Sequence, residues 1–276
     1  MALLLACGVA TAWFGSGLKM PATTARDGAF LTFNRYAQEP IPDVVLVGSS
    51  ITNRLSESYF STPKLRNLAL AGGSPVTGLE IVAARSQLPK LILVEANVLA
   101  RAVDTSMVDR YSRIDAGPLF FRPIRAIIAA YENRRHAPLS SAEASAALEQ
   151  LVKAPPADLA DGRFLQLAVE AGDSQDPGPV TQTNAASIAR LAASIEQRGS
   201  RLMLFELPVP KEVAAARFAT ITRKTVRDAF PGPSHWLPIE VARDELRWPD
   251  GVHLDARSAV LVARSIDRAI VALQGR

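Results

Sequence analysis

The sequence predicts an α/β fold in which a parallel sheet is covered by helices on both faces. Short runs of apolar, largely β-branched residues recur along the chain and are typical of buried strands. Amphipathic stretches with helical spacing lie between several of these runs. This alternation of strand and helix is the pattern of a parallel sheet with helices on both sides.

Length and composition fit one large domain. The chain has 276 residues, of which 48% are hydrophobic, enough for a sizeable core. The net charge is only +4 and the basic residues are scattered, so nothing indicates a nucleic-acid partner. The single cysteine, Cys7, excludes an internal disulfide and a cysteine-based zinc site, and three histidines are too few and too scattered for a histidine metal cluster. We therefore expect no metal and no organic cofactor.

The N-terminal segment, residues 1–18, is uncharged and mostly apolar. It is at the short limit for a membrane span and also resembles the core of a signal peptide. We expect a signal or an uncleaved membrane anchor, and hence a periplasmic or otherwise extracytoplasmic protein; a buried helix is the alternative. Residues 19–42 carry Pro21, Pro40 and Pro42 among polar residues and are expected to be a linker.

The expected domain, residues 43–276, begins with the strand Val44–Val47. Gly48 ends this strand, and Ser50 follows at a strand-to-helix turn. In α/β proteins, sites lie at the carboxyl ends of the parallel strands. The helix N-terminus behind the serine supplies free backbone N–H groups and the positive end of a dipole. A nucleophilic serine needs this geometry, and a serine that only caps the helix is the alternative.

The remaining elements follow in alternation. Further strands are expected at Leu65–Leu70, Leu91–Val94 and Leu202–Phe205, with a short edge strand at His235–Ile239. Helices are expected at Thr77–Leu88, Asn184–Arg198, Lys211–Phe230 and Ala256–Leu273.

An insertion at about residues 100–182 departs from this alternation. It is punctuated by Pro118, Pro123, Pro138, Pro155 and Pro156, and Asp173–Pro179 has the composition of a polar loop. Ser140 and Glu143 form a candidate capping box for a helix that runs to Val152. We expect a mostly helical insertion that acts as a lid or acceptor-binding surface, or that packs on the edge of the sheet.

Four short blocks lie at, or just beyond, the ends of expected elements. They are Gly48-Ser49-Ser50-Ile51-Thr52, Asn67-Leu68-Ala69-Leu70-Ala71-Gly72, Glu95-Ala96-Asn97 and Asp250-Gly251-Val252-His253. Together they resemble the SGNH, or GDSL-like, hydrolase superfamily, which is named for a serine, a glycine, an asparagine and a histidine in this chain order. The resemblance covers roughly residues 43–100 and 185–273. It implies a three-layer α/β/α, flavodoxin-like sheet.

The resemblance also implies a role for each of these motif residues. Ser50 aligns with the nucleophile, which needs a base because a free hydroxyl is a weak nucleophile at neutral pH. His253 would take the proton and return it to the leaving group, and Asp250 would hold the imidazole Nδ1–H. The backbone N–H groups of Ser50 and Gly72 and the side-chain amide of Asn97 would form the oxyanion hole.

Two positions depart from the family's pattern. The family usually has aspartate where this chain has Ser49, and glycine where it has Glu95. Neither change removes a catalytic group, but the Glu95 carboxylate next to the expected donor Asn97 must point away or be paired. With these departures the chain resembles the SGNH-like O-acetyltransferases of bacterial cell envelopes, such as those that modify alginate and teichoic acid.

Three functions remain open at this point. The first is a serine-dependent O-acyl ester hydrolase that acts through an acyl-serine on an acylated carbohydrate or another small ester. The second is a polysaccharide O-acetyltransferase that uses the same residues, with a membrane acyl-donor protein as partner. The third is a non-catalytic carbohydrate-binding relative, against which the intact Ser50, Asp250 and His253 count. The first two share every catalytic residue.

Overall fold

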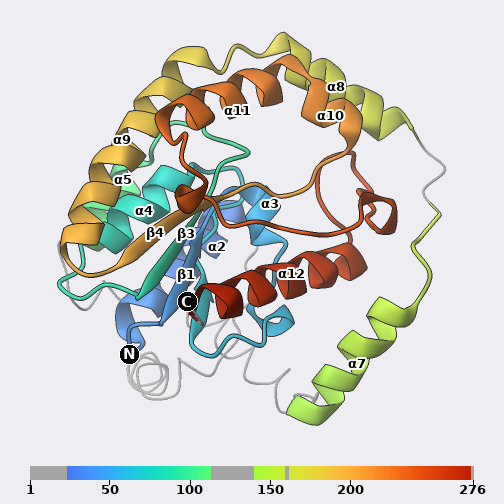
Figure 1. Ribbon diagram of the computed structural model, residues 1–276, viewed down its shortest axis with the longest axis horizontal. Coiled ribbons are helices and arrows are strands. Elements are labelled where there is room, and N and C mark those ends of the chain that lie inside the picture. Colours follow the sequence, from blue (N-terminus) through green and yellow to red (C-terminus); the bar gives the residue numbers. More distant parts are fainter. Residues whose placement is uncertain (1–23, 113–139, 159–161, 275–276) are drawn as a thin grey trace, which may run out of the picture.

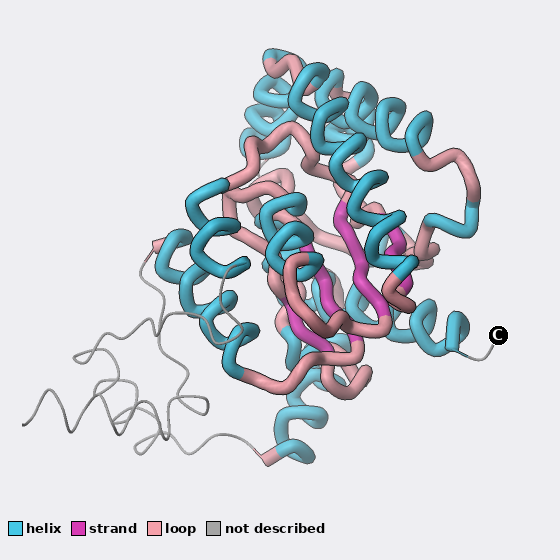
Figure 2. Tube along the Cα trace, turned by 90° about the vertical axis from the view of Figure 1, so that its left-hand side faces the viewer, coloured by secondary structure: helices cyan, strands magenta, loops and turns pink. Residues whose placement is uncertain are grey.

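A four-stranded, all-parallel sheet lies at the centre of the protein, with the strand order β2-β1-β3-β4 (Figure 1). The computed structural model describes residues 24–112, 140–158 and 162–274. The strands are β1 (Val44–Val47), β2 (Leu65–Asn67), β3 (Leu91–Glu95) and β4 (Arg201–Phe205). Helices lie on both sides of this sheet, as the side view of Figure 2 shows, and the predicted α/β class is therefore confirmed.

Two apolar cores cover the two faces of the sheet. Successive side chains of a strand point to opposite faces, so Val45 and Val47 enter one core and Val44 and Leu46 the other. The first core is closed by α2 (Ala25–Gln38), α4 (Pro75–Ala83), α5 (Thr105–Ser112), α9 (Gly178–Gln197) and α11 (Arg217–Ala229). The second is closed mainly by α12 (Ala256–Gln274), together with α3 (Ser50–Asn53).

The register of the sheet determines where a site can form. Val44 pairs with Leu91, and Val47 pairs with Val94. The segments that follow β1 and β3 therefore leave the sheet side by side, at its carboxyl edge. Because strands of a parallel sheet share this edge, residues that are distant in sequence meet there.

The prediction that residues 19–42 form a linker is wrong for most of this segment. Ala25–Gln38 form the helix α2, whose side chains Phe33 and Tyr36 are buried against the sheet. The Thr24 hydroxyl caps this helix by accepting a hydrogen bond from the Asp27 N–H. Apolar residues spaced three apart decide the structure here, and the prolines that indicated a linker lie outside the helix.

Two elements near the C-terminal end also differ from expectation. The long helix expected over Lys211–Phe230 is divided into α10 (Lys211–Ala215) and α11, because Ala216 has an extended backbone. The edge strand expected at His235–Ile239 is reduced to one bridge between Leu204 and Trp236. Pro238 lacks the N–H that a longer ladder would need.

The described part of the insertion is helical, as predicted. It contains α5, α7 (Ser141–Lys153) and α8 (Arg163–Ser174), and the capping box of Ser140 and Glu143 is confirmed. The polar loop is shorter than expected, since α8 runs to Ser174 and α9 begins at Gly178. In Figure 1, α7 lies beside α12, whereas α8 lies against α10 and α11.

Smaller differences concern element ends. The strand β2 stops at Asn67, although the Leu68 and Leu70 N–H groups still donate to carbonyls of the β1 segment. The helix α4 begins after its cap Ser74 and ends at Ala83, well before the proline that was expected to stop it. Among the described residues no helix is both long and apolar enough to cross a membrane, and residues 1–18 lie outside them.

Candidate active site

Ser50 is the first residue of α3, directly beyond the carboxyl end of β1. The preceding Ser49 is the N-cap of this helix, and its hydroxyl accepts a hydrogen bond from the Ile51 N–H. The buried Ile51 side chain anchors the turn in the second core. The capping role therefore falls to Ser49, which leaves the Ser50 hydroxyl for another partner.

That partner is His253, from the loop that precedes α12. The Ser50 Oγ lies 2.8 Å from the His253 Nε2, and the His253 Nδ1 lies 2.7 Å from a carboxylate oxygen of Asp250. When Nδ1–H donates to Asp250, the Nε2 lone pair is the acceptor for the Ser50 hydroxyl. Hydroxyl, imidazole and carboxylate thus form one hydrogen-bonded chain.

Asp250 is held in place by the loop that it begins. One of its carboxylate oxygens accepts hydrogen bonds from the backbone N–H groups of Val252 and His253, at 3.1 and 2.7 Å. Partial burial by itself raises the pKa of the Asp250 carboxyl, but the hydrogen bonds from His253 and Val252 outweigh it and hold this pKa below its ordinary value. Asp250 is therefore ionised at neutral pH and faces the imidazole as an anion.

Gly251 allows this loop to pass close to α8. Its φ of +80° lies in the left-handed region, and a Cβ placed on it would lie 2.7 Å from the Phe164 carbonyl oxygen and 2.9 Å from the Leu165 Cα. Both contacts are with backbone, which cannot move aside as a flexible side chain can. The start of α8 is thus packed directly against the segment that carries Asp250 and His253.

The turn that carries Ser50 is fixed by Glu95, the last residue of β3. The Glu95 side chain is completely buried. One carboxylate oxygen accepts hydrogen bonds from the Ser49 N–H at 2.7 Å, the Thr52 N–H at 3.3 Å and the Thr52 hydroxyl at 2.6 Å. The other accepts from the Ser49 hydroxyl at 2.7 Å. The two departures from the family pattern, Ser49 and Glu95, therefore bond directly to each other.

Burial raises the pKa of the Glu95 carboxyl, and the hydrogen bonds from Thr52 and Ser49 oppose that rise. The carboxylate is thus paired with the turn that carries Ser50, which is one of the two arrangements expected for a charge next to Asn97. Gly48 makes this approach possible, because a Cβ there would lie 2.7 Å from a Glu95 carboxylate oxygen.

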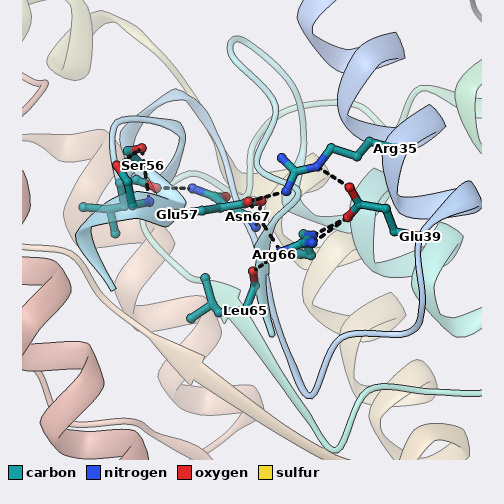
Figure 3. A network of polar contacts seen from close by, with 9 residues as sticks. Arg35, Glu39, Ser56, Glu57, Leu65, Arg66 and Asn67 are labelled. Carbon is teal, nitrogen blue, oxygen red and sulfur yellow. Dashed lines mark hydrogen bonds and ion pairs between the residues drawn. The ribbon is translucent and has the colours of Figure 1, made fainter. Parts of the chain in front are cut away.

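Asn67 holds the other end of α3. Its side-chain amide donates to the carbonyl oxygens of Thr52 and Leu55, at 2.8 and 2.7 Å. Its own backbone N–H donates to Glu57, which also pairs with Arg35 of α2 (Figure 3). Figure 3 shows this polar network extending from Glu57 through β2 to Arg35 and the C-cap Glu39 of α2, which explains why α2 belongs to the domain.

The expected oxyanion donors line the same cavity as Ser50 and His253. This cavity, of about 290 Å³, includes Gly72 and Asn97 in its lining. The Asn97 amide nitrogen donates one hydrogen to the Leu207 carbonyl at 2.9 Å, and the Leu207 N–H donates back to the Asn97 oxygen at 2.7 Å. An amide nitrogen carries two hydrogens, so this pairing orients Asn97 and leaves one donor.

The structure thus brings together all five residues selected from the sequence: Ser50, Gly72, Asn97, Asp250 and His253. Sequence reasoning did not assign the tethering role of Glu95. A charged residue at the end of an otherwise apolar strand must find partners when it is buried, and that signal was present. The pairing of Asn97 with Leu207 and the walls of the cavity had no signal in the motif.

Comparison of the sequence with models of protein families, and with curated proteins, finds no match in either case. Within the described ranges, no group of three or more histidine, cysteine, aspartate or glutamate side chains could hold a metal ion. The chemistry that the site can perform follows from its geometry: a hydroxyl whose proton can pass to an imidazole that faces a carboxylate.

Proposed function

We propose that this protein is a serine-dependent O-acyl ester hydrolase of the SGNH-like kind, which acts through an acyl-serine intermediate. The observation that carries the proposal is the continuous hydrogen-bonded chain of Ser50, His253 and Asp250 at the carboxyl edge of a parallel sheet. A Ser–His–Asp chain is recognised by its geometry, whatever the fold.

In the first half of the reaction, the Ser50 Oγ attacks the acyl carbonyl and its proton passes to the His253 Nε2. Asp250 stabilises the imidazolium that forms. The N–H groups of Ser50 and Gly72 and the free hydrogen of the Asn97 amide stabilise the oxyanion. The carbon–oxygen bond of the ester then breaks, and His253 gives its proton to the departing alcohol.

In the second half, a water molecule attacks the acyl-serine. His253 takes a proton from this water and then returns one to the Ser50 Oγ, which releases the carboxylic acid and restores the enzyme. Within this proposal the substrate is an acylated carbohydrate or another small ester, and no cofactor takes part.

A polysaccharide O-acyltransferase is the second candidate. The direct bond between Ser49 and Glu95 favours it, because these two positions depart from the hydrolase pattern as they do in envelope O-acetyltransferases. A sugar hydroxyl would then replace water as the attacking group. A membrane acyl-donor protein would be the partner, and residues 1–18 would keep the enzyme in an extracytoplasmic location.

The experiment is labelling with a fluorophosphonate, followed by peptide mass spectrometry. The proposal expects one adduct, on Ser50, and its loss in Ser50→Ala and His253→Ala but not in the control Ser234→Ala, an exposed serine in another part of the chain. No adduct in folded protein, or an adduct on Ser49, would overturn it. A chromogenic acetyl ester assayed with and without an oligosaccharide then separates the candidates, since only a transferase forms the acylated sugar.

A further inference from the structure

The cavity at Ser50 extends away from the reacting atoms toward three helices. Its far walls come from α8, α10 and α11, which contribute Ala168, Val213, Phe218 and Ala219. Val98 and Val209, beyond the ends of β3 and β4, complete an apolar wall on the sheet side. The cavity therefore joins the site at Ser50 to a chamber whose walls are mainly apolar.

The lining favours a hydrocarbon in this chamber over a sugar. Val98, Val213 and Phe218 are only partly buried, so each would lose further contact with water when an apolar group enters. A sugar ring would instead lose hydrogen bonds from its hydroxyls to water. Among the polar residues of the lining, Glu206 and Arg223 pair with each other.

Two exposed polar residues, Arg101 and Gln175, also line the cavity and are open to water. The apolar residues that α10 and α11 contribute are Val213, Phe218 and Ala219, and the paired Arg223 is the polar residue that α11 adds to the lining.

We infer that this chamber binds the acyl chain of the ester, and that the preferred acyl group is a medium-length chain of about six to eight carbons. The inference rests on the proposed function. A cavity of about 150 Å³ holds a benzene molecule of six carbons. The chamber and the reaction centre share about 290 Å³. The volume therefore exceeds what an acetyl group fills and leaves room for the carbonyl and the leaving oxygen.

The wall formed by α8 sets the upper limit of chain length. A Cβ placed on Gly172 would lie 3.0 Å from the Ala216 Cβ, so α8 already touches the junction of α10 and α11. At its other end α8 meets Gly251 by backbone contact. This helix cannot move inward or be displaced without disturbing both contacts, so we expect a definite optimum of chain length. The insertion thus contributes a wall of the acyl site.

The test is the rate of cleavage of 4-nitrophenyl esters with two to twelve acyl carbons. The kcat/KM should rise by up to about fourfold for each added methylene, the value for complete burial. It should reach its maximum near six to eight carbons and fall for the longest chains. A maximum at acetyl, or a rate independent of chain length, would overturn the inference.

A matched pair of variants locates the chain. Ala219→Leu fills part of the chamber, and Ala229→Leu makes the same change at an exposed position of the same helix. Ala219→Leu should lower the ratio of octanoyl to acetyl ester cleavage by about tenfold or more, since methylene discrimination in apolar pockets is of this order. Ala229→Leu should leave this ratio unchanged. Equal ratios in both variants would contradict the inference.

A binding measurement separates failure of this inference from failure of the proposed function. Calorimetry on Ser50→Ala should show octanoate binding more tightly than butyrate, with a negative heat-capacity change, and Ala219→Leu should weaken the binding of octanoate. If Ser50 is not labelled and no ester is cleaved, the proposed function fails. If Ser50 is labelled but octanoate binds no better than butyrate, only the acyl-chain site fails.

Discussion

Replacing Glu95 by leucine should destabilise the protein through the turn that carries Ser50. Leucine has a similar size but no acceptor, so the buried N–H groups of Ser49 and Thr52 lose their partner. Each unsatisfied buried group costs about 1–3 kcal/mol, so the loss is about 2–6 kcal/mol. Glu95→Gln is the control, because its carbonyl oxygen can accept both N–H bonds while its NH₂ donates to the Ser49 hydroxyl. We expect a loss below about 1 kcal/mol for it.

The assay is urea unfolding of the wild type and the two variants at one pH. For a slope of about 3 kcal/mol/M, Glu95→Leu should lower the midpoint by about 0.7–2 M without changing the slope. Ester cleavage per folded molecule should also fall in Glu95→Leu, since its turn no longer holds Ser50 in register with His253. If the leucine and glutamine variants unfold at the same urea concentration, the bonds to Glu95 do not stabilise the turn.

The pH dependence of the same difference gives an independent test. Burial raises the pKa of Glu95 in the folded protein above its ordinary value of 4.5. A carboxyl of this kind stabilises the folded state fully below its unfolded pKa, and this contribution is lost as the pH rises through the folded pKa. The stability of the wild type relative to Glu95→Gln should therefore decrease as the pH rises above 4.5. A difference that grows with pH would contradict the reasoning.

Three further predictions concern the site. Asn97→Ala should lower kcat by about 10²–10³-fold, because a donor to the oxyanion acts mainly in the transition state, and kinetics with an acetyl ester measures it. Gly251→Ala should lower both the unfolding temperature and kcat. Gly199 has a similar positive φ, but a Cβ placed on it would contact no other atom, so Gly199→Ala should lower only the unfolding temperature. Asp250→Asn should lower kcat by less than His253→Ala, because it leaves the proposed base in place but removes the anion that faces it.

Each of these can fail independently. Activity of Asn97→Ala that falls only in step with the folded fraction would make this residue structural. If the two glycine variants lower kcat equally, the contact between Gly251 and α8 does not position Asp250 and His253. Full activity of His253→Ala would end the proposed mechanism.

The sequence predicted those elements that have a local pattern of apolar residues. The strands predicted at Val44–Val47 and Leu91–Val94 are apolar on both faces, which indicated their place between two layers of helices. The break at Ala216 was not, because the surrounding alanine-rich sequence favours a continuous helix. Tertiary contacts impose it: the Arg217 N–H donates to the Asp173 carboxylate, at the C-terminal end of α8.

Some residues of the candidate site could likewise be predicted from the sequence, whereas several of its contacts could not. The order of the four blocks identified Ser50 and His253, whose hydrogen bond joins the two ends of the domain. The carboxylate of Glu95 was seen as a charge that needed a partner, but motif spacing says nothing about which backbone N–H groups face it. The chamber depends on how α8 packs against α10 and α11. These helices are far apart from α8 in the sequence, so no local sequence pattern predicts their contact.

The bond between Ser50 and His253 spans 203 positions of the chain, and this has a consequence for the protein during its synthesis. All four strands precede His253 in the chain and are therefore synthesised before it. A nascent chain therefore contains Ser50 before it contains the imidazole that the proposed mechanism assigns to it as base. The proposed ester cleavage would then begin only after the C-terminal part of the chain has been made. Ester cleavage would thus indicate that the contact between Ser50 and His253 has formed. A chain released before His253 is made would cleave no ester.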